Sequence, residues 1–297
     1  MIILAGDIGG TKTWLQIAEF SPAEDSIEEV GQELPLRERF SVLFEQRFVS
    51  AEYDDFDTVM AAFLQAAQQK GVPLPESACI GVAGPIVGLG SGNQSAKVTN
   101  LPWQLDAQKL AKQHHLRRLS LINDFQAVAF GLEMLAEDEL HVLQAGSVPE
   151  DALLPPKVVI GAGTGLGQAL LVRLNESGPN QYKVISSEGG HCDFAAAGSL
   201  QRELLFYLAE KQKRVTVEDV LSGRGLVNIY HFLAHRSSVG TSRNLAEAMR
   251  TGDAAAAVGE AALSGSDAVA RQAVDLFVEI YGTQAGNYAL TCMAKGG

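Results

Sequence analysis

Residues 119–130 read Leu-Ser-Leu-Ile-Asn-Asp-Phe-Gln-Ala-Val-Ala-Phe. The apolar run 119–122 is typical of a buried strand, and the apolar spacing from Phe125 onward is typical of a helix. Asn123 and Asp124 therefore stand where a strand gives way to a helix, which predicts a position at the carboxyl edge of a sheet. In open α/β sheets, ligands bind at that edge. The alternative is that Asp124 only caps the helix, because Asp and Asn are favoured N-cap residues.

The composition is that of an ordinary globular protein. The chain has 297 residues, enough for two domains, of which 46% are hydrophobic and 20% charged. Its formal charge of -12 would repel phosphate backbones, so we expect no nucleic-acid binding. No apolar run approaches the ~20 residues of a membrane helix, and no secretion signal is evident, so we expect a cytoplasmic protein without membrane contact. The three widely spaced cysteines fit neither a disulfide framework nor a zinc site.

A glycine-rich turn follows the first apolar segment. Residues 2–5 are typical of a strand, residues 6–11 read Gly-Asp-Ile-Gly-Gly-Thr, and a second strand is predicted over 14–20. This order predicts a β-hairpin. Backbone N–H groups in such a turn can bind an anion, although a plain β-turn is the alternative. Asp7 could lie beside phosphates only if a cation were present.

The same order recurs in the second half of the chain. A strand at 158–160 precedes Gly-Ala-Gly-Thr-Gly-Leu-Gly at 161–167, and a strand-like segment follows at 169–174. The alternative is a dinucleotide-binding fingerprint, but that motif must open a helix. We therefore predict a second hairpin with a phosphate-binding turn, and the repetition suggests a duplicated unit.

The remaining pattern predicts two α/β domains. The first covers 1–134 and the second, with a large helical share, covers 135–297. Residues 135–156 are predicted to connect them. Further strands are expected at 40–48, 79–85 and 184–187, and helices at 56–69, 106–115, 199–211, 225–235, 242–250, 253–263 and 266–294.

Two phosphate-binding turns imply a bound nucleotide, and several polar residues suit a sugar. Asn123, Asp124, Glu188, His191 and Glu218 carry the amides and carboxylates that can hydrogen-bond vicinal hydroxyls. The glycines between Glu188 and His191 argue against a helical metal-binding pair. His191 and Glu218 also have structural interpretations, His191 as a hydrogen-bonded structural histidine and Glu218 as a solvated helix residue.

Taken in order, the motifs resemble the bacterial-type (non-ROK) glucokinase family of the actin/hexokinase/Hsp70-like ATPase superfamily. The resemblance implies an α/β, two-domain actin-like ATPase (ribonuclease H-like) fold. A cleft would separate a smaller N-terminal domain from a larger C-terminal one. The motifs are GDIGGT at 6–11, AGPI at 83–86, TNLPW at 99–103, INDF at 122–125, GAGTGLG at 161–167, SEGGHCDF at 187–194, VLSGRGLVNIY at 220–230 and GNYAL at 286–290.

The resemblance also implies an activity, the ATP-dependent phosphorylation of D-glucose at its 6-hydroxyl, the entry step of glycolysis. Asp124 would be the catalytic base, and Asn123, Asp124, Glu188, His191 and Glu218 would bind the sugar. Mg²⁺ would lie near Asp7, through water. The phosphates of ATP would lie on two sets of residues: Gly6, Asp7, Ile8, Gly9, Gly10 and Thr11, and Gly161, Gly163, Thr164 and Gly165.

Further expectations follow from the same resemblance. A homodimer is expected, and family members continue beyond the position of Gly297, so a C-terminal segment would be missing. The alternatives are a kinase for another hexose and a non-catalytic sugar-binding relative.

Overall fold

A computed structural model describes residues 1–21, 36–88, 93–146, 155–173, 182–237 and 240–297. The chain forms two compact units, Met1–Leu143 and Gln144–Gly297. The boundary between them lies within the segment 135–156 that the sequence marks as connecting. Each unit has its own hydrophobic core.

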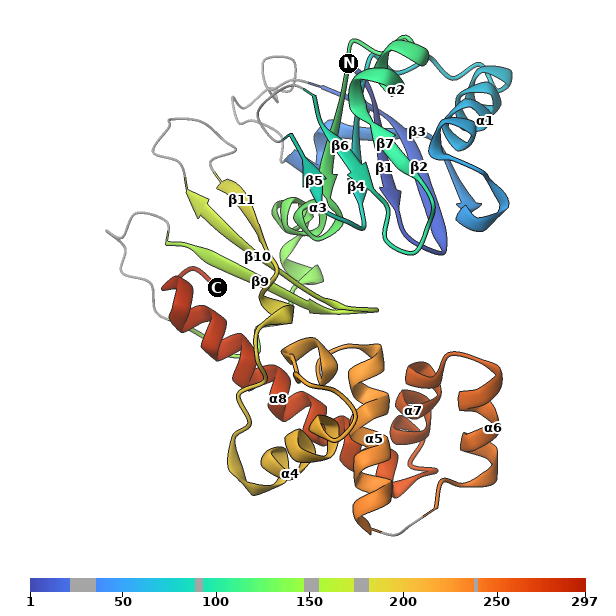
Figure 1. Cartoon of the computed structure of the whole chain (residues 1–297). Helices are drawn as coiled ribbons and strands as arrows, with labels where there is room; N and C mark the ends of the chain where they lie inside the picture. Colours follow the sequence, from blue (N-terminus) through green and yellow to red (C-terminus); the bar gives the residue numbers. More distant parts are fainter. Residues whose placement is uncertain (22–35, 89–92, 147–154, 174–181, 238–239) are drawn as a thin grey trace. The chain divides into compact units, whose positions relative to one another are not determined.

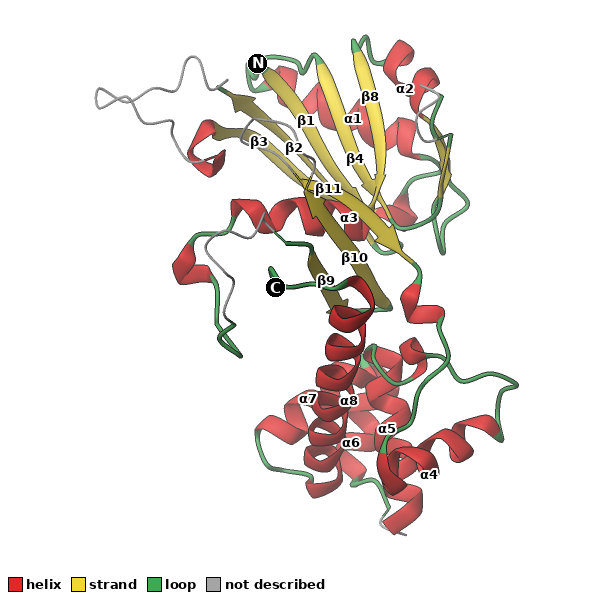
Figure 2. Cartoon of the chain, turned by 90° about the vertical axis from the view of Figure 1, so that its left-hand side faces the viewer, coloured by secondary structure: helices red, strands yellow, loops and turns green. Residues whose placement is uncertain are grey.

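The first unit is built on a five-stranded sheet with the order β3-β2-β1-β4-β8. Strands β1, β2 and β3 form an antiparallel meander (Figure 1). Strand β4 pairs in parallel with β1 on one side and with β8 on the other (Figure 2). The carboxyl ends of β1, β4 and β8 therefore share one edge, as predicted for Asn123. The strands are β1 (Ile2–Ile8), β2 (Lys12–Phe20), β3 (Phe40–Val49), β4 (Ser77–Val82) and β8 (Arg118–Asn123).

Helix α1 (Phe56–Gln69) covers this sheet with one apolar stripe. The carboxylate of Asp55 caps the helix by accepting a hydrogen bond from the N–H of Thr58. The chain leaves the helix through Gly71, which has a left-handed φ of 72°. The stripe that enters the core is formed by Phe56, Val59, Met60, Phe63 and Ala67, at the spacing of one helix face.

Two further helices and a small sheet complete the first unit. Helix α2 (Ala107–Gln113) packs next to β8, and α3 (Asp124–Gly131) follows β8 directly. A second sheet of β5 (Ile86–Val87), β6 (Ser95–Lys97) and β7 (Gln104–Asp106) was not predicted. Strands of two or three residues are too short to show an alternating pattern. Short 3₁₀ turns lie at Leu36–Arg39, Ser50–Glu52, Leu132–Met134 and Glu137–Glu139.

The second unit combines a three-stranded sheet with a helical bundle. Its strands β9 (Lys157–Ala162), β10 (Leu166–Arg173) and β11 (Tyr182–Ser187) form an antiparallel meander in the order β11-β10-β9. Because a strand and not a helix follows the glycine-rich turn, the dinucleotide-fingerprint alternative is wrong. The helices are α4 (Gly198–Ala209), α5 (Gly223–Ser237), α6 (Arg243–Thr251), α7 (Ala254–Leu263) and α8 (Ala268–Cys292).

Helix α8 joins the bundle to the sheet of this unit. Along its length it packs against α5, α7 and β9 (Figure 2). Near its middle, the Tyr281 hydroxyl donates a hydrogen bond of 2.9 Å to the carbonyl oxygen of Ile160 in β9. Asp267 caps the start of the helix by accepting from the N–H of Ala270. In the described part of the chain, no helix is both long and apolar enough to cross a membrane.

We predict that Phe63→Ala destabilises the first unit by about 3–5 kcal/mol, because it leaves a cavity where a fully buried ring contacts the sheet. Phe206→Ala is the matched control. That ring is 69% exposed on α4, and its loss should change the free energy of unfolding by about 0.5 kcal/mol or less. Urea denaturation followed by circular dichroism measures both, and equal effects would contradict the described core.

Candidate functional site

Residues 9–11 form the turn between β1 and β2, and a serine from another element holds it. The N–H of Gly9 donates to the carbonyl oxygen of Lys12 at 2.9 Å. The buried Ser50 donates through its hydroxyl to the carbonyl oxygen of Gly9 at 3.1 Å, and its N–H donates to the carbonyl oxygen of Thr11 at 3.0 Å. The hairpin prediction is therefore confirmed, and hydrogen bonds from Ser50 hold both the first and the last residue of the turn.

Asn123 and Asp124 occupy different positions at the start of α3: the first is the N-cap and the second is the first helical residue. The Asn123 side-chain oxygen accepts hydrogen bonds from the N–H groups of Phe125 and Gln126, at 3.1 and 3.2 Å, so Asn123 is the N-cap. The alternative that Asp124 is the cap is wrong. Asp124 is the first residue of the helix, where its carboxylate accepts from the N–H of Phe125 at 2.8 Å. A helix N-terminus favours a negative charge at this position.

Asp7 and Asp124 lie on the same side of the sheet edge, with a glycine between them. Asp7 pairs with Gly81 in the register of β1 and β4. A Cβ atom on Gly81 would lie 3.7 Å from the Asp124 Cα and 3.4 Å from the Ala127 Cβ. Gly81 therefore lets α3 approach β4 closely, and no side chain intervenes between the strand and the start of the helix.

The electrostatics of Asp7 reflect this arrangement. Although Asp7 keeps contact with solvent, surrounding protein atoms partly desolvate its carboxylate, and this raises its pKa; repulsion from Asp124 raises it further. Two carboxylates that repel each other favour a cation nearby. Within the described residues, no group of three or more His, Cys, Asp and Glu side chains gathers to hold a metal. A cation here would need ligands from water or from a bound phosphate.

In the second unit, the glycine turn between β9 and β10 is tied to Glu218. The N–H of Gly163 donates to the carbonyl oxygen of Gly165, and the N–H of Gly223 donates to the carbonyl oxygen of Gly163, both at 2.8 Å. The N–H of Leu166 donates to the Glu218 Oε2 at 3.0 Å. A Cβ atom on Gly165 would lie 2.7 Å from that same oxygen. Glu218 is therefore a partner of the turn and not the solvated helix residue of the alternative interpretation.

Glu188 precedes a short 3₁₀ turn, Gly189–His191, that follows β11, and His191 is the last residue of that turn. Their side chains are 81% and 63% exposed, and the Glu188 Oε2 lies 3.7 Å from the His191 Nε2. The turn rests on β10, because a Cβ atom on Gly190 would lie 2.7 Å from the Leu166 carbonyl oxygen. The structure thus gathers Glu188, His191 and Glu218 around the first residues of β10, and it gathers Asp7, Asn123 and Asp124 at the sheet edge of the first unit.

A family model described as Glucokinase matches residues 4–297. The chain belongs to the glucokinase family. The glucokinase of Nostoc sp. is 40% identical over 310 residues, with 100% of this chain and 82% of that protein covered. The glucokinase of Synechocystis sp. is 38% identical, with 99% and 81% covered.

Solved glucokinase structures share the fold. The glucokinase of an Antarctic psychrotroph is 27% identical, with a TM-score of 0.74 and with 100% of this chain and 81% of that chain covered. The Balamuthia mandrillaris glucokinase, solved with glucose, is 25% identical, with a TM-score of 0.67 and with 98% and 76% covered. A ROK-family glucokinase of Streptomyces griseus, at 19% identity and a TM-score of 0.55, shares the fold alone. The glucokinase-family chain therefore has the expected two-domain actin-like fold.

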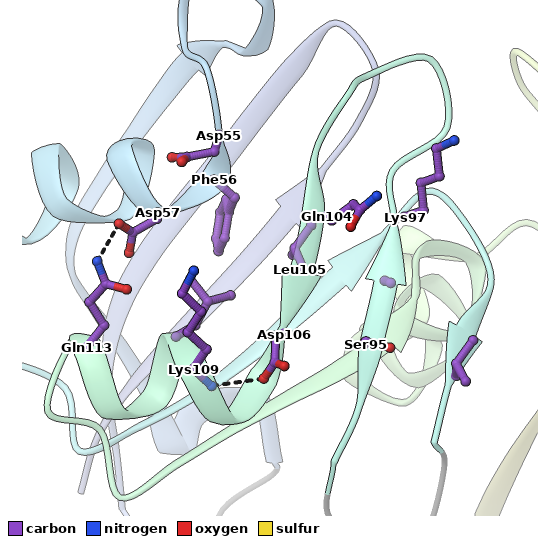
Figure 3. A pocket seen from close by; sticks show the side chains of 13 residues that line it. Asp55, Phe56, Asp57, Ser95, Lys97, Gln104, Leu105, Asp106, Lys109 and Gln113 are labelled. Atoms are coloured by element: carbon purple, nitrogen blue, oxygen red, sulfur yellow. Dashed lines mark hydrogen bonds between the residues drawn. The ribbon is translucent and has the colours of Figure 1, made fainter.

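A pocket of about 520 Å³ in the first unit involves none of the predicted site residues. It lies among the start of α1, the small sheet and α2, as Figure 3 shows. Its acidic side chains already have structural partners. Asp55 and Asp106 cap α1 and α2, and Asp57 accepts hydrogen bonds from Gln113 and pairs with His114. The hydrogen bonds of Asp57 join α1 to the end of α2, so these acidic residues have a structural role. The pocket is separate from the candidate site.

Some residues next to the candidate site were not predicted as part of it. Asn100 has a left-handed φ of 64° and lies next to the first glycine turn. A Cβ atom placed on Gly10 would lie 3.4 Å from the Cβ atom of Asn100. Ser50, which holds the turn between β1 and β2, was not predicted either. Asn100 lies within the motif at 99–103, and asparagine is the residue type that tolerates a left-handed φ, so a signal existed. A single buried serine gives no such signal.

We predict that Asp7→Asn stabilises the protein at pH 7. Folding raises the pKa of the Asp7 carboxyl, so this group favours the folded state fully below its ordinary pKa of 3.8, where it is protonated in both states. This contribution to the free energy of unfolding is lost as the pH rises through the raised pKa, because the folded protein then carries the crowded charge. The amide removes this loss, so the gain should be present at pH 7 and vanish below pH 3.8.

Thermal denaturation across this pH range measures the effect, with Asp54→Asn as the control. Asp54 is exposed in the same unit, so its replacement removes an equal charge without relieving the crowded pair. An Asp7→Asn variant that melts below the wild type at pH 7 would contradict the described repulsion.

Proposed function

We infer that this chain is a glucokinase that transfers the γ-phosphoryl group of ATP to the 6-hydroxyl of D-glucose. The observation that carries the inference is the match to the glucokinase family over residues 4–297, together with relatives named glucokinase at up to 40% identity. The relatives described above are all glucokinases, and none favours another hexose or a non-catalytic role. Phosphorylation of glucose by the purified chain in a coupled assay tests it.

We propose that Asp124 is the catalytic base. In this role its carboxylate takes the proton of the sugar 6-hydroxyl while that oxygen forms a bond to the γ-phosphorus, and the bond to the ADP oxygen breaks. The first turn of α3 holds the carboxylate through the N–H of Phe125, which leaves its other oxygen available. Its place at the carboxyl edge of the sheet supports the role, because ligands of α/β sheets bind there.

We propose that Asn123, Glu188, His191 and Glu218 bind the sugar together with Asp124. Hydrogen bonds within each unit limit what each group can offer. The Asn123 oxygen is used by the helix cap, so its NH₂ group is the part that can donate to a sugar oxygen. The Glu218 Oε2 accepts from the N–H of Leu166, and Oε1, which lies 3.8 Å from an Arg224 guanidinium nitrogen, is the oxygen that would accept from a hydroxyl.

We propose that the two glycine turns bind the phosphates of ATP. Gly6, Asp7, Ile8, Gly9, Gly10 and Thr11 form the first set, and Gly161, Gly163, Thr164 and Gly165 form the second. Narrow turns with little side chain allow backbone N–H groups to approach an anion. Mg²⁺ bound to the nucleotide would neutralise phosphate charge, and Asp7 would contact it through water. The repulsion between Asp7 and Asp124 supports a cation at this edge.

We further propose that the enzyme is a homodimer, as the family resemblance implies, and that it is cytoplasmic, as expected from its sequence. Multi-angle light scattering of the purified chain tests the assembly. A mass near the monomer value of 31.6 kDa at micromolar concentration would contradict it.

Asp124→Asn should lower kcat by about 10²- to 10⁴-fold, the usual contribution of a general base, because an amide does not take the proton. Glucose binding should persist, since the side chain keeps its shape. Asp253→Asn is the control: Asp253 caps α7, and asparagine caps equally well. A coupled assay for glucose 6-phosphate gives kcat, and a near-normal value for Asp124→Asn would remove Asp124 from this role.

Glu188→Gln should raise KM for glucose by about 10- to 100-fold with a smaller effect on kcat, because a hydrogen bond to a charged acceptor contributes about 1.5–3 kcal/mol. Glu203→Gln is the control, since Glu203 forms a surface ion pair with Arg236 on α4 and α5. Steady-state kinetics over a range of glucose concentrations separate the two constants. An unchanged KM would show that Glu188 does not contact the sugar.

A further inference from the structure

The first residues of β10 support the three candidate sugar-binding residues of the second unit. The N–H of Leu166 holds the Glu218 carboxylate at 3.0 Å, and the Leu166 carbonyl oxygen lies directly against Gly190. The next inward-facing residue, Gln168, is only 2% exposed. Strand β10 begins immediately after the glycine turn at 163–165, so this segment joins the proposed phosphate and sugar sites.

The Gln168 amide occupies the space that a side chain at Gly189 would need. A Cβ atom on Gly189 would lie 2.0 Å from the Gln168 Oε1 and 2.9 Å from its Cδ, well inside van der Waals contact. Gly189 does not have a left-handed φ, so its backbone conformation alone would accept another residue. The amide of Gln168 therefore lies against the backbone of the turn that carries Glu188 and His191.

The amide of Gln168 carries a cost that a purely structural residue would avoid. Among the described residues, none forms a hydrogen bond with its buried Nε2. Leaving a buried donor unpaired costs about 1–3 kcal/mol. Gln201 is equally buried at 2% exposure and shows the contrast: its Oε1 accepts from the N–H of Ala197 and its Nε2 donates to Glu279.

We propose that Gln168 is a positioning residue for glucose binding. Its amide fixes the turn Gly189–His191 on β10 and thereby sets the orientation of Glu188 and His191 relative to Glu218. This inference rests on the proposed sugar-binding role of those residues. Sugar binding by Glu188 and His191 would then depend on Gln168, a buried side chain that does not touch the sugar. The unpaired amide of Gln168 lowers the free energy of unfolding.

Gln168→Met tests the proposal, because methionine has similar length and volume but no amide. The variant should raise KM for glucose by about fivefold or more, the size of effect expected between contacting residues, and leave KM for ATP unchanged. Its melting temperature should equal or exceed that of the wild type, because no unpaired amide remains. Gln201→Met, the matched control, should melt at a lower temperature with an unchanged KM for glucose. A normal KM in Gln168→Met would overturn the proposal.

A double-mutant cycle with Gly189 provides the second test. Gly189→Ala places a methyl group against the amide and should raise KM for glucose, whereas Gln168→Ala creates space for that methyl group. The double variant should therefore have the KM for glucose of Gln168→Ala alone, and effects that simply multiply would overturn the contact. Wild-type protein that neither phosphorylates nor binds glucose would instead overturn the proposed function, and this inference with it.

Discussion

Parallel hydrogen bonding between β1, β4 and β8 is the constraint on which the first half of the candidate site depends. It aligns Asp7 with Gly81 and Val82 with Asn123, so that residues far apart in the sequence end at one sheet edge. The absence of a side chain at Gly81 then lets the start of α3 approach. As a result, the carboxylates of Asp7 and Asp124 lie close enough to repel each other, and the strand register keeps them there. The sheet, and not the local sequence, brings these charges together.

The two glycine turns obey a common rule. Each links the first two strands of an antiparallel meander, and each is held by a residue from a later segment: Ser50 for the first turn, and Gly223 with Glu218 for the second. Glycine gives a turn close access to an anion but also makes the unfolded chain more flexible. Hydrogen bonds from outside the turn offset that flexibility and hold the backbone of each turn in place.

Many of the secondary-structure elements could be predicted, because each depends on the sequence of a short segment. The hairpins at Gly6–Thr11 and Gly161–Gly167, helix α1 and the strand leading to Asn123 follow from apolar periodicity and glycine placement. The exchange of roles between Asn123 and Asp124 could not be predicted, because both residues are good caps and only the register of β8 decides between them. The small sheet β5–β7 and the support given by Gln168 were likewise invisible, since they depend on contacts between segments that share no sequence pattern.

Helix α8 has a mechanical consequence for the second unit. It is one uninterrupted rod of 25 residues that contacts the bundle helices α5 and α7 and, through Tyr281, the backbone of β9. A single helix thus contacts both the bundle and the sheet of this unit. A displacement of β9 would therefore also change the packing of α8 against α5 and α7. The turn between β9 and β10, which we propose binds phosphate, is linked in this way to the bundle.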